Sequence, residues 1–528
     1  MLPTEPAADR LEADVLTFDR RSFLAAVMAF GAGTALMSVG LGPAAAAPGG
    51  VIRFGIGDSF AGEKLDPATV QNGGSLELVA VIYETLVRRG PDWTFKPWLA
   101  ESWTLSDDAK TWTFTLRKGV LFHDGSPLTT KDVVYTIKRH LDETLGSALQ
   151  KRLSASFTPD GLEIVDDHVF KINMTRPDTL LVESFSRFII GIIKEGTVGE
   201  VDVSTAVGTG PFKLTAFAPG EAWEVERFEG YWMEGVPAAE KIQCVYIPDQ
   251  SAKVQAVTSG AMDIVDGVDA AVLKDLKTDP SVRIAFLPNA QYWGIFLSQE
   301  AKPFDDVRVR RAIKLAVDRK LILDTVYQGN GTITPDVPVP PGDPIFPEAM
   351  GDGAQDIEAA KALLAEAGYP DGIEFELFTS PLLPGMVDLA VVFAESVKPA
   401  GIKVSVNQWP TSTYWDQIWL KRPAYVDYMN RRNAHDAMDL TFANGSPYNG
   451  SKFDPDGALR AAIEAAIGEP DKEKQVTLYK AALTRVAMES GTVIPCYVHQ
   501  HSVLNAAVAG NPYEWEMPRS LFALAKEA

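Results

Sequence analysis

Six histidines are the first residues in this sequence that could take part in catalysis or bind a metal ion. Only His499 and His501 lie close together, two positions apart, so on a strand they share one face and could hold a metal. We favour the alternative, two polar side chains on a surface strand. The sequence contains no H-E-x-x-H, G-x-S-x-G or S-x-x-K motif and no phosphate-binding G-x-x-x-x-G-K-[ST] loop. It therefore predicts no catalytic residue, no metal site and no cofactor.

Glycines and acidic residues leave two further kinds of chemistry to consider. Residues 207–212 are rich in glycine, but Pro211 and the spacing do not fit a dinucleotide fingerprint, so we interpret this stretch as a turn. The 70 acidic residues include enough carboxylates for a glycoside-hydrolase pair, although no spacing selects one. An extracytoplasmic hydrolase is therefore kept as the alternative to a protein without chemistry of its own.

Length and composition describe a soluble globular protein with more than one lobe. The chain has 528 residues, of which 46% are apolar and 23% are charged, and it is too long for a single ordinary domain. The net charge is −21, which disfavours binding to nucleic acid. Cys244 and Cys496 allow one disulfide but do not form a disulfide framework.

The first 46 residues have the features of an export signal. Arg20 and Arg21 precede a stretch, residues 22–52, that contains no charged residue and is interrupted by glycines. An A-x-A type cleavage site follows, and we place the cut after Ala46. Paired arginines, a mildly apolar segment and small residues at the cut are typical of a twin-arginine signal. The alternative is an uncleaved membrane anchor. We expect an exported, periplasmic protein with its signal peptide at residues 1–46.

Strand and helix patterns alternate along the rest of the chain. Residues 112–117 alternate between apolar and polar side chains, as in a half-buried strand. Asp306 precedes apolar residues at i, i+3, i+4, i+7 and i+8, which predicts a helix with one face in the core. Further predictions are strands at 51–57, 374–378 and 402–406, helices at 76–87, from 129 and at 356–367, and a loop at 329–352. This mixture predicts α/β lobes.

Short motifs follow one another in a characteristic order. They include residues 65–67 (LDP), 83–86 (YETL), 97–103 (PWLAESW), 106–125 (SDDAKTWTFTLRKGVLFHDG), 207–212 (VGTGPF), 231–232 (YW), 303–310 (PFDDVRVR) and 367–370 (AGYP). In this order they resemble the family 5 extracellular solute-binding proteins, which are the dipeptide, oligopeptide and nickel binders of ABC importers. The resemblance covers essentially the whole chain after the predicted signal.

The resemblance implies a two-lobed periplasmic-binding-protein fold of the α/β class that closes on its ligand about a hinge. Lobe I would comprise residues 47–290 and 500–528, with an inserted subdomain at about 96–205, and lobe II residues 295–498. The hinge would cross near 289–297 and 494–502. The resemblance also implies a monomer without enzymatic activity that delivers a small-molecule or peptide ligand to the membrane subunits of an ABC permease.

Charged residues of lobe II are the predicted ligand-binding groups. Peptide binders of this family use an Asp for the free amine with an Arg shortly before it, and Arg432 and Asp436 lie in that region. Tyr448 and Asn449 follow where one branch of the family has a Trp-Asn pair. Arg432 would then bind a carboxylate, Asp436 would accept from an ammonium or guanidinium, and Asn449 would orient the ligand. The alternative is a structural salt bridge between Arg432 and Asp436.

Aromatic residues supply the remaining candidates. Tyr292 and Trp293 lie at the proposed hinge, Trp415 precedes the charged region, and Phe60 lies in the loop before residues 65–67. Each could contact a ligand, and the alternative for each is a place in the core. The Arg-to-Asp spacing of peptide binders is not reproduced, so opines and other amino-acid conjugates are open as well as peptides. Glycosides and metal chelates are further alternatives on the same fold.

Overall fold

The computed structural model describes residues 49–57, 63–70, 73–90, 94–197, 201–268, 270–381, 385–514 and 520–526. The predicted signal at residues 1–46 and the candidate Phe60 lie outside these ranges. Within them, no helix combines the length and the apolar character that crossing a membrane requires.

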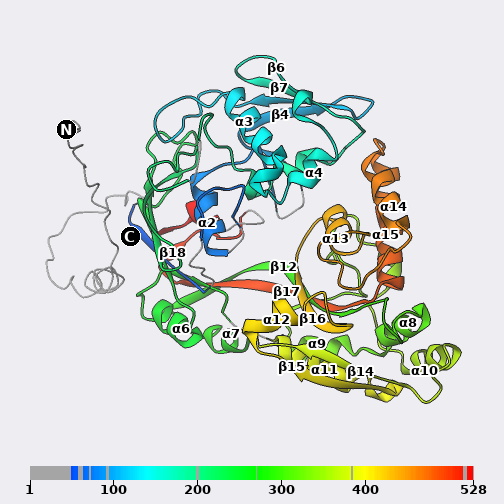
Figure 1. The fold of residues 1–528 in the computed structure, drawn as a ribbon. Helices are drawn as coiled ribbons and strands as arrows, with labels where there is room; N and C mark the ends of the chain where they lie inside the picture. Colours follow the sequence, from blue (N-terminus) through cyan, green and yellow to red (C-terminus); the bar gives the residue numbers. More distant parts are fainter. Residues whose placement is uncertain are drawn as a thin grey trace, which may run out of the picture.

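One large mixed sheet runs through the molecule, in the strand order β15-β14-β16-β12-β17-β11-β1-β10-β9-β8, with β13 paired to β17. The two longest strands, β12 and β17, are antiparallel neighbours and cross the middle of the molecule (Figure 1). The strands of this sheet are β1 (Val51–Ile56), β8 (Phe212–Ala218), β9 (Ala222–Arg227), β10 (Lys241–Tyr246), β11 (Ile264–Asp266), β12 (Val282–Leu297), β13 (Gly331–Ile333), β14 (Ile373–Thr379), β15 (Ile402–Gln408), β16 (Ala424–Asn430) and β17 (Thr492–Asn505).

Two large hydrophobic cores lie on either side of these long strands. One core contains buried residues from Ile52 to Ile264 and from Leu504 to Leu524, and we call the part of the chain around it lobe I. The other contains buried residues from Tyr292 to Val498, and we call its surroundings lobe II. Since β12 and β17 pass from one core to the other, they are the elements through which the two lobes are joined in the sheet.

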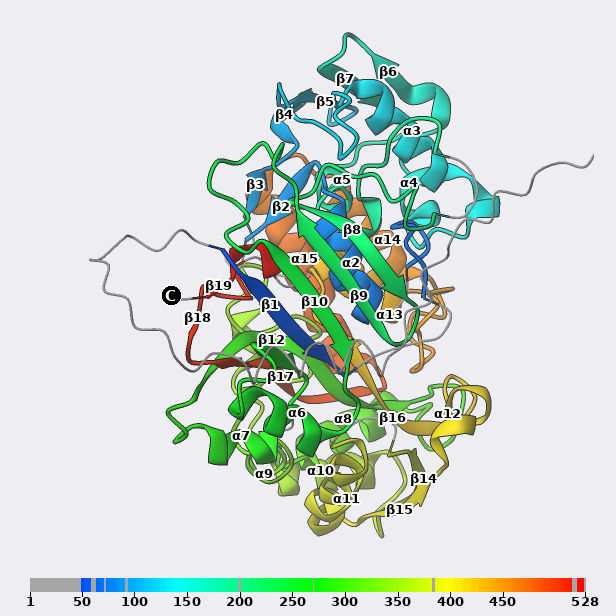
Figure 2. The same cartoon turned by 90° about the vertical axis from the view of Figure 1, so that its left-hand side faces the viewer.

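Lobe I also carries a separate four-stranded sheet in the order β4-β5-β7-β6. Phe114 of this sheet stacks on Phe170 at 5.1 Å between ring centroids and meets Phe185 edge-on at 5.4 Å. Figure 2 shows this unit at the end of the molecule opposite β14 and β15. Its elements are β4 (Ala100–Leu105), β5 (Thr111–Leu116), β6 (Leu162–Ile164), β7 (Val169–Asn173), α3 (Thr130–Leu141), α4 (Gln150–Ser154) and the short α5 (Leu181–Ser184).

Most of the longer helices belong to lobe II, where α13, α14 and α15 form a group of their own (Figure 1). They are α8 (Val307–Ala316), α9 (Arg319–Val326), α10 (Ile357–Glu366), α11 (Met386–Val397), α12 (Thr411–Gln417), α13 (Ala434–Thr441), α14 (Ala458–Ile467) and α15 (Lys472–Glu489). Lobe I adds α2 (Gly73–Ile82), α6 (Gln250–Thr258), α7 (Ala270–Leu276) and the short strands β2 (Val87–Arg89), β3 (Phe95–Pro97), β18 (Val508–Ala509) and β19 (Ala525–Lys526).

Most predicted elements are confirmed, and one is wrong at its end. Thr129 and Asp132 form the capping box of α3, and Asp306 caps α8 by accepting from the Arg308 backbone N–H at 2.8 Å. The helix predicted at 76–87 stops at Ile82, whose carbonyl accepts from the Gly210 N–H at 2.9 Å instead of continuing the helix. The predicted loop at 329–352 contains β13.

The two cysteines are buried in different cores and form no disulfide. Cys244 lies in the core of lobe I and Cys496 in the core of lobe II. Burial raises the pKa of the Cys496 thiol well above its usual range, which keeps this thiol protonated.

Candidate ligand-binding site

A loop of lobe I, residues 176–187 with the short helix α5 inside it, contacts the helices of lobe II. The backbone N–H and the hydroxyl of Thr179 both donate to the Ile467 carbonyl at the end of α14, each at 3.0 Å. The Gln475 side chain of α15 donates to the Thr179 hydroxyl. These bonds join residues that are almost 300 positions apart, and β12 and β17 take no part in them.

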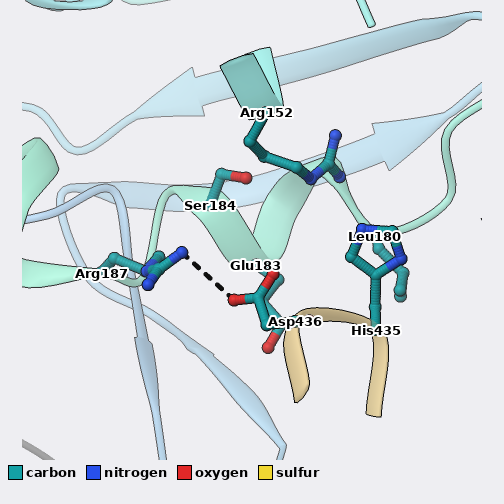
Figure 3. A pocket seen from close by; sticks show the side chains of 7 residues that line it. All are labelled: Arg152, Leu180, Glu183, Ser184, Arg187, His435 and Asp436. Atoms are coloured by element: carbon teal, nitrogen blue, oxygen red, sulfur yellow. Dashed lines mark hydrogen bonds and ion pairs between the residues drawn. The ribbon is translucent and has the colours of Figure 1, made fainter. Parts of the chain in front are cut away.

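An ion pair extends this contact to α13. Arg187 of lobe I donates to the Asp436 carboxylate of lobe II at 3.1 Å (Figure 3). Asn433 caps α13 by accepting from the Asp436 backbone N–H at 2.7 Å, and its amide donates across the lobes to Glu183. Burial alone would raise the pKa of Asp436, but Arg187 and His435 hold it below its ordinary value, so the carboxylate is ionised.

A second, more deeply buried pair supports the same loop from within lobe I. Arg152 donates to Asp178 at 2.6 Å, and the Ser156 hydroxyl donates to the same carboxylate at 2.5 Å. Arg152, Arg187, His435 and Asp436 line the space that remains between the lobes here, together with Leu180, Glu183 and Ser184 (Figure 3). The cavity enclosed there has a volume of about 10 Å³, which is room for one water.

Arg432 precedes α13 and differs from these paired cations. Its Nε atom is buried without a hydrogen-bond partner, and no carboxylate among the described residues pairs with its guanidinium. The guanidinium carbon lies 5.5 Å from the centroid of the Tyr448 ring, in a cation–π contact. Burial lowers the pKa of Arg432 and Arg187 lowers it further, against the opposing effect of Asp436. A cation in this environment favours an incoming anion.

Aromatic rings continue from Tyr448 along lobe II. The Trp419 ring lies 6.2 Å from Tyr448 and 5.4 Å from Trp415, whose side chain is 42% exposed and therefore open to a ligand. The indole N–H of Trp419 donates to Asp427 at 2.8 Å. Asp427 is buried on β16, and burial raises its pKa to about 7. Sequence reasoning missed Asp427, although a carboxylate within the apolar run 424–429 was a usable signal.

Other predicted site residues have structural surroundings. Tyr292 is buried and meets Tyr497 edge-on at 5.4 Å, while Trp293 is buried against Tyr428 at 5.4 Å. The Asn449 side chain is buried, and its amide donates to the carbonyls of Phe442, Ala443 and Phe453 at 2.8–3.2 Å. The Asn449 carbonyl oxygen accepts from the Phe453 N–H at 3.0 Å, so this side chain holds the loop after α13 together.

The structure does not contain the salt bridge between Arg432 and Asp436 that the sequence left open. Asp436 pairs with Arg187, which is 249 positions away, and it forms no ion pair with Arg432. His499 and His501 lie on β17 beside the exposed ring of Phe286, at 5.6 Å and 6.2 Å. No group of three or more His, Cys, Asp or Glu side chains suited to a metal ion occurs in the described part of the chain.

Comparisons with known proteins agree on a family. Residues 94–467 match the bacterial extracellular solute-binding proteins, family 5 Middle. The chain is 30% identical over 434 residues to heme-binding protein A of Haemophilus influenzae, covering 73% of this chain and 76% of that protein. It is 26% identical to di/tripeptide-binding protein 1 of Pseudomonas aeruginosa, covering 73% and 77%. The structure of the PBP AgaA in complex with agropinic acid, from A. tumefacien R10, superposes with a TM-score of 0.74 at 25% identity, covering 91% and 99% of the two chains.

Proposed function

This chain belongs to family 5 of the bacterial extracellular solute-binding proteins, and we propose that it captures a peptide or an amino-acid conjugate for an ABC importer. The ligand would bind between the two lobes and pass to the membrane subunits of the permease. The protein itself would perform no chemistry. Such a ligand stabilises the closed form because it contacts both lobes only when they are together.

The environment of Arg432 carries this proposal. The Arg432 side chain is half-buried, its Nε atom is buried without a hydrogen-bond partner, and no carboxylate among the described residues pairs with it, so an anionic ligand would neutralise a partly desolvated charge. A ligand carboxylate meets that need with two parallel hydrogen bonds. Tyr448 and the exposed face of Trp415 would then contact the apolar part of the ligand.

Two of the three proteins compared above have names or titles that fit this ligand class, while the third is named for heme. One relative is named for di- and tripeptides, and AgaA was solved with agropinic acid. Peptides and opines both carry carboxylates on an amino-acid skeleton, which is the chemistry that Arg432 would recognise. In this proposal Asp436 and Asn449 hold the shape of the site. The buried rings of Tyr292 and Trp293 support it from the core.

We further propose the division of the chain and its destination. Residues 1–46 would be a twin-arginine signal, lobe I would be 47–290 with 500–528, and lobe II would be 295–498. Replacing Arg20 and Arg21 with lysines should keep the protein in the cytoplasm, and unchanged export would exclude this pathway. The exported protein would act as a periplasmic monomer.

Native mass spectrometry of the gently purified protein tests the function. We expect a discrete added mass that, once released, is identified as a peptide or an amino-acid conjugate, and we expect it to be absent from Arg432→Met. If the purified protein carries no ligand, thermal-shift screening with peptides, opines and sugars takes the place of mass spectrometry. Stabilisation by sugars alone, or peptide cleavage during incubation, would overturn the proposal.

A further inference from the structure

Arg187 meets Asp436 from the opposite lobe, where a ligand ammonium was expected. The pair spans 3.1 Å, and the two side chains are 32% and 14% exposed, so the contact is partly desolvated. Asp436 is held in place by its helix, because Asn433 accepts its backbone N–H in the first turn of α13. The carboxylate is therefore already satisfied by a cation of the protein when the lobes are together.

The other carboxylates near this contact are satisfied by the protein as well. Glu183 accepts from Arg89 at 2.8 Å and from the Asn433 amide. Asp178 accepts from Arg152 at 2.6 Å. Each of these carboxylates has its own arginine.

Arg432 is the charge left over. Three arginines pair with three carboxylates around the contact, and the guanidinium of Arg432 adds one positive charge without a partner among the described residues. A ligand ammonium placed here would lie between like charges, and the three carboxylates at this contact, Asp436, Glu183 and Asp178, are already paired. Juxtaposed like charges at an interface are a common way of rejecting a wrong partner.

We propose that Arg187 occupies the place of a ligand ammonium on Asp436, so that the site selects carboxylate ligands whose amino group is acylated or absent. The inference rests on the proposed function and makes Arg187 its specificity-determining residue. Because Arg187 and Asp436 belong to different lobes, their pair forms only when the lobes meet. In the closed form Arg187 therefore provides the positive charge next to Asp436 that the free amine of a ligand would otherwise provide.

Matched ligands test the proposal. A series of dipeptides, each in free and in N-acetylated form, is titrated by calorimetry into the purified wild-type protein, Arg187→Gln and Arg176→Gln. Arg176 is the control, because it lies on the same loop and faces Glu464 of lobe II at 3.8 Å in a more exposed pair. We expect the wild type and Arg176→Gln to bind the acetylated forms about 10-fold or more tightly than the free forms.

The variant Arg187→Gln should lose this preference, since Asp436 then becomes available to an ammonium. The gain in binding of free amines should vanish again in Arg187→Gln/Asp436→Asn. A wild type that prefers free amines, or an acetyl preference that Arg187→Gln leaves unchanged, would overturn the inference while leaving the proposed function intact. Absence of binding by both forms to every protein in the series would overturn the inference, and the proposed function would fall with it only if opines and the other amino-acid conjugates also fail to bind.

Discussion

Two charged side chains, the buried Glu84 of lobe I and the half-buried Arg432 of lobe II, have opposite surroundings. Glu84 is completely buried, and burial raises its pKa, against the opposing effects of Tyr231, Arg88, Thr209 and Trp232. Its carboxylate accepts four side-chain hydrogen bonds. The donors are the Trp98 indole at 2.6 Å, the Tyr231 hydroxyl at 2.7 Å, the Thr209 hydroxyl at 2.9 Å and the Trp232 indole at 3.1 Å. Arg432 has the Tyr448 ring and an Nε atom with no partner.

The difference separates a group that holds a lobe together from one that we propose for ligand binding. Glu84 links segments around residues 84, 98, 209 and 231, so its hydrogen bonds are part of the folded core of lobe I. An unpaired guanidinium stabilises nothing by itself, whereas it gains a partner when an anionic ligand binds. The contrast predicts that removing Glu84 harms folding, whereas removing Arg432 harms binding.

Glu84→Ala should have the largest effect. It leaves two buried donors, Trp98 and Thr209, and two half-buried ones without their acceptor, and the expected loss is about 3–5 kcal/mol of unfolding free energy, as for breaking other buried charged networks. Denaturant unfolding of the purified variant measures it. The control is Glu101→Ala on β4, where the side chain is exposed and the expected change is below about 0.5 kcal/mol. If Glu84→Ala lost as little unfolding free energy as the control, Glu84 would have no structural role.

Asp427 lies between the two extremes, with the Trp419 indole as its side-chain donor. Its pKa is raised from 3.8 to about 7, because burial outweighs the hydrogen bonds. Between these two values the unfolded chain releases the proton and the folded protein keeps it, so stability should fall as the pH rises from about 4 to 7 and then level off. The full shift corresponds to about 4 kcal/mol at most.

Unfolding measured at several pH values in parallel with Asp427→Asn isolates this contribution. The variant removes the titrating group but keeps an acceptor for Trp419, so its stability should decline less over the same pH range. Equal slopes for both proteins would mean that Asp427 is ionised in the folded state.

Arg432→Met should weaken ligand binding and leave stability intact, the opposite of what we expect for Glu84→Ala. Methionine fills a similar volume beside Tyr448 without a charge, so the free protein should unfold at the same denaturant concentration as the wild type or higher. Affinity for a carboxylate ligand should fall about 100-fold, or about 2.8 kcal/mol. Calorimetry with the ligand released from the wild type measures the loss. An unfolded variant, or one that binds the ligand normally, would contradict the proposed role of Arg432 in binding a ligand carboxylate.

Sequence reasoning predicted local features and missed contacts between distant segments. The caps at Thr129 and Asp306 were predictable because the capping residue and the helix are adjacent. Arg432 and Asp436 were placed in the right region, yet the partner of Asp436 is Arg187, and no local pattern links residues 249 positions apart. The helix predicted at 76–87 ended early because Gly210, far along the chain, binds the Ile82 carbonyl. Tertiary contacts decided each of these outcomes.

The smallest expected effect concerns the neutral part of the contact between the lobes. Thr179→Val removes the hydroxyl that donates to Ile467 and accepts from Gln475, but it keeps the backbone hydrogen bond to Ile467. The variant loses two neutral hydrogen bonds, but Gln475 still donates to the Ala466 carbonyl and Ile467 still accepts from the Thr179 N–H, so the closed form should lose about 1 kcal/mol relative to the open form. Ligand affinity should therefore fall about 5-fold, mainly through faster dissociation, which stopped-flow displacement measures.

Arg176→Ala provides the comparison for this last variant. It removes a charge from the same loop, but its pair with Glu464 spans 3.8 Å and both side chains are more than a third exposed. Exposed pairs of this kind contribute well under 1 kcal/mol, so dissociation should hardly change. If Arg176→Ala accelerated dissociation more than Thr179→Val, net charge rather than burial would govern the contact between the lobes. The distinction drawn from Glu84 and Arg432 would then not extend to this contact.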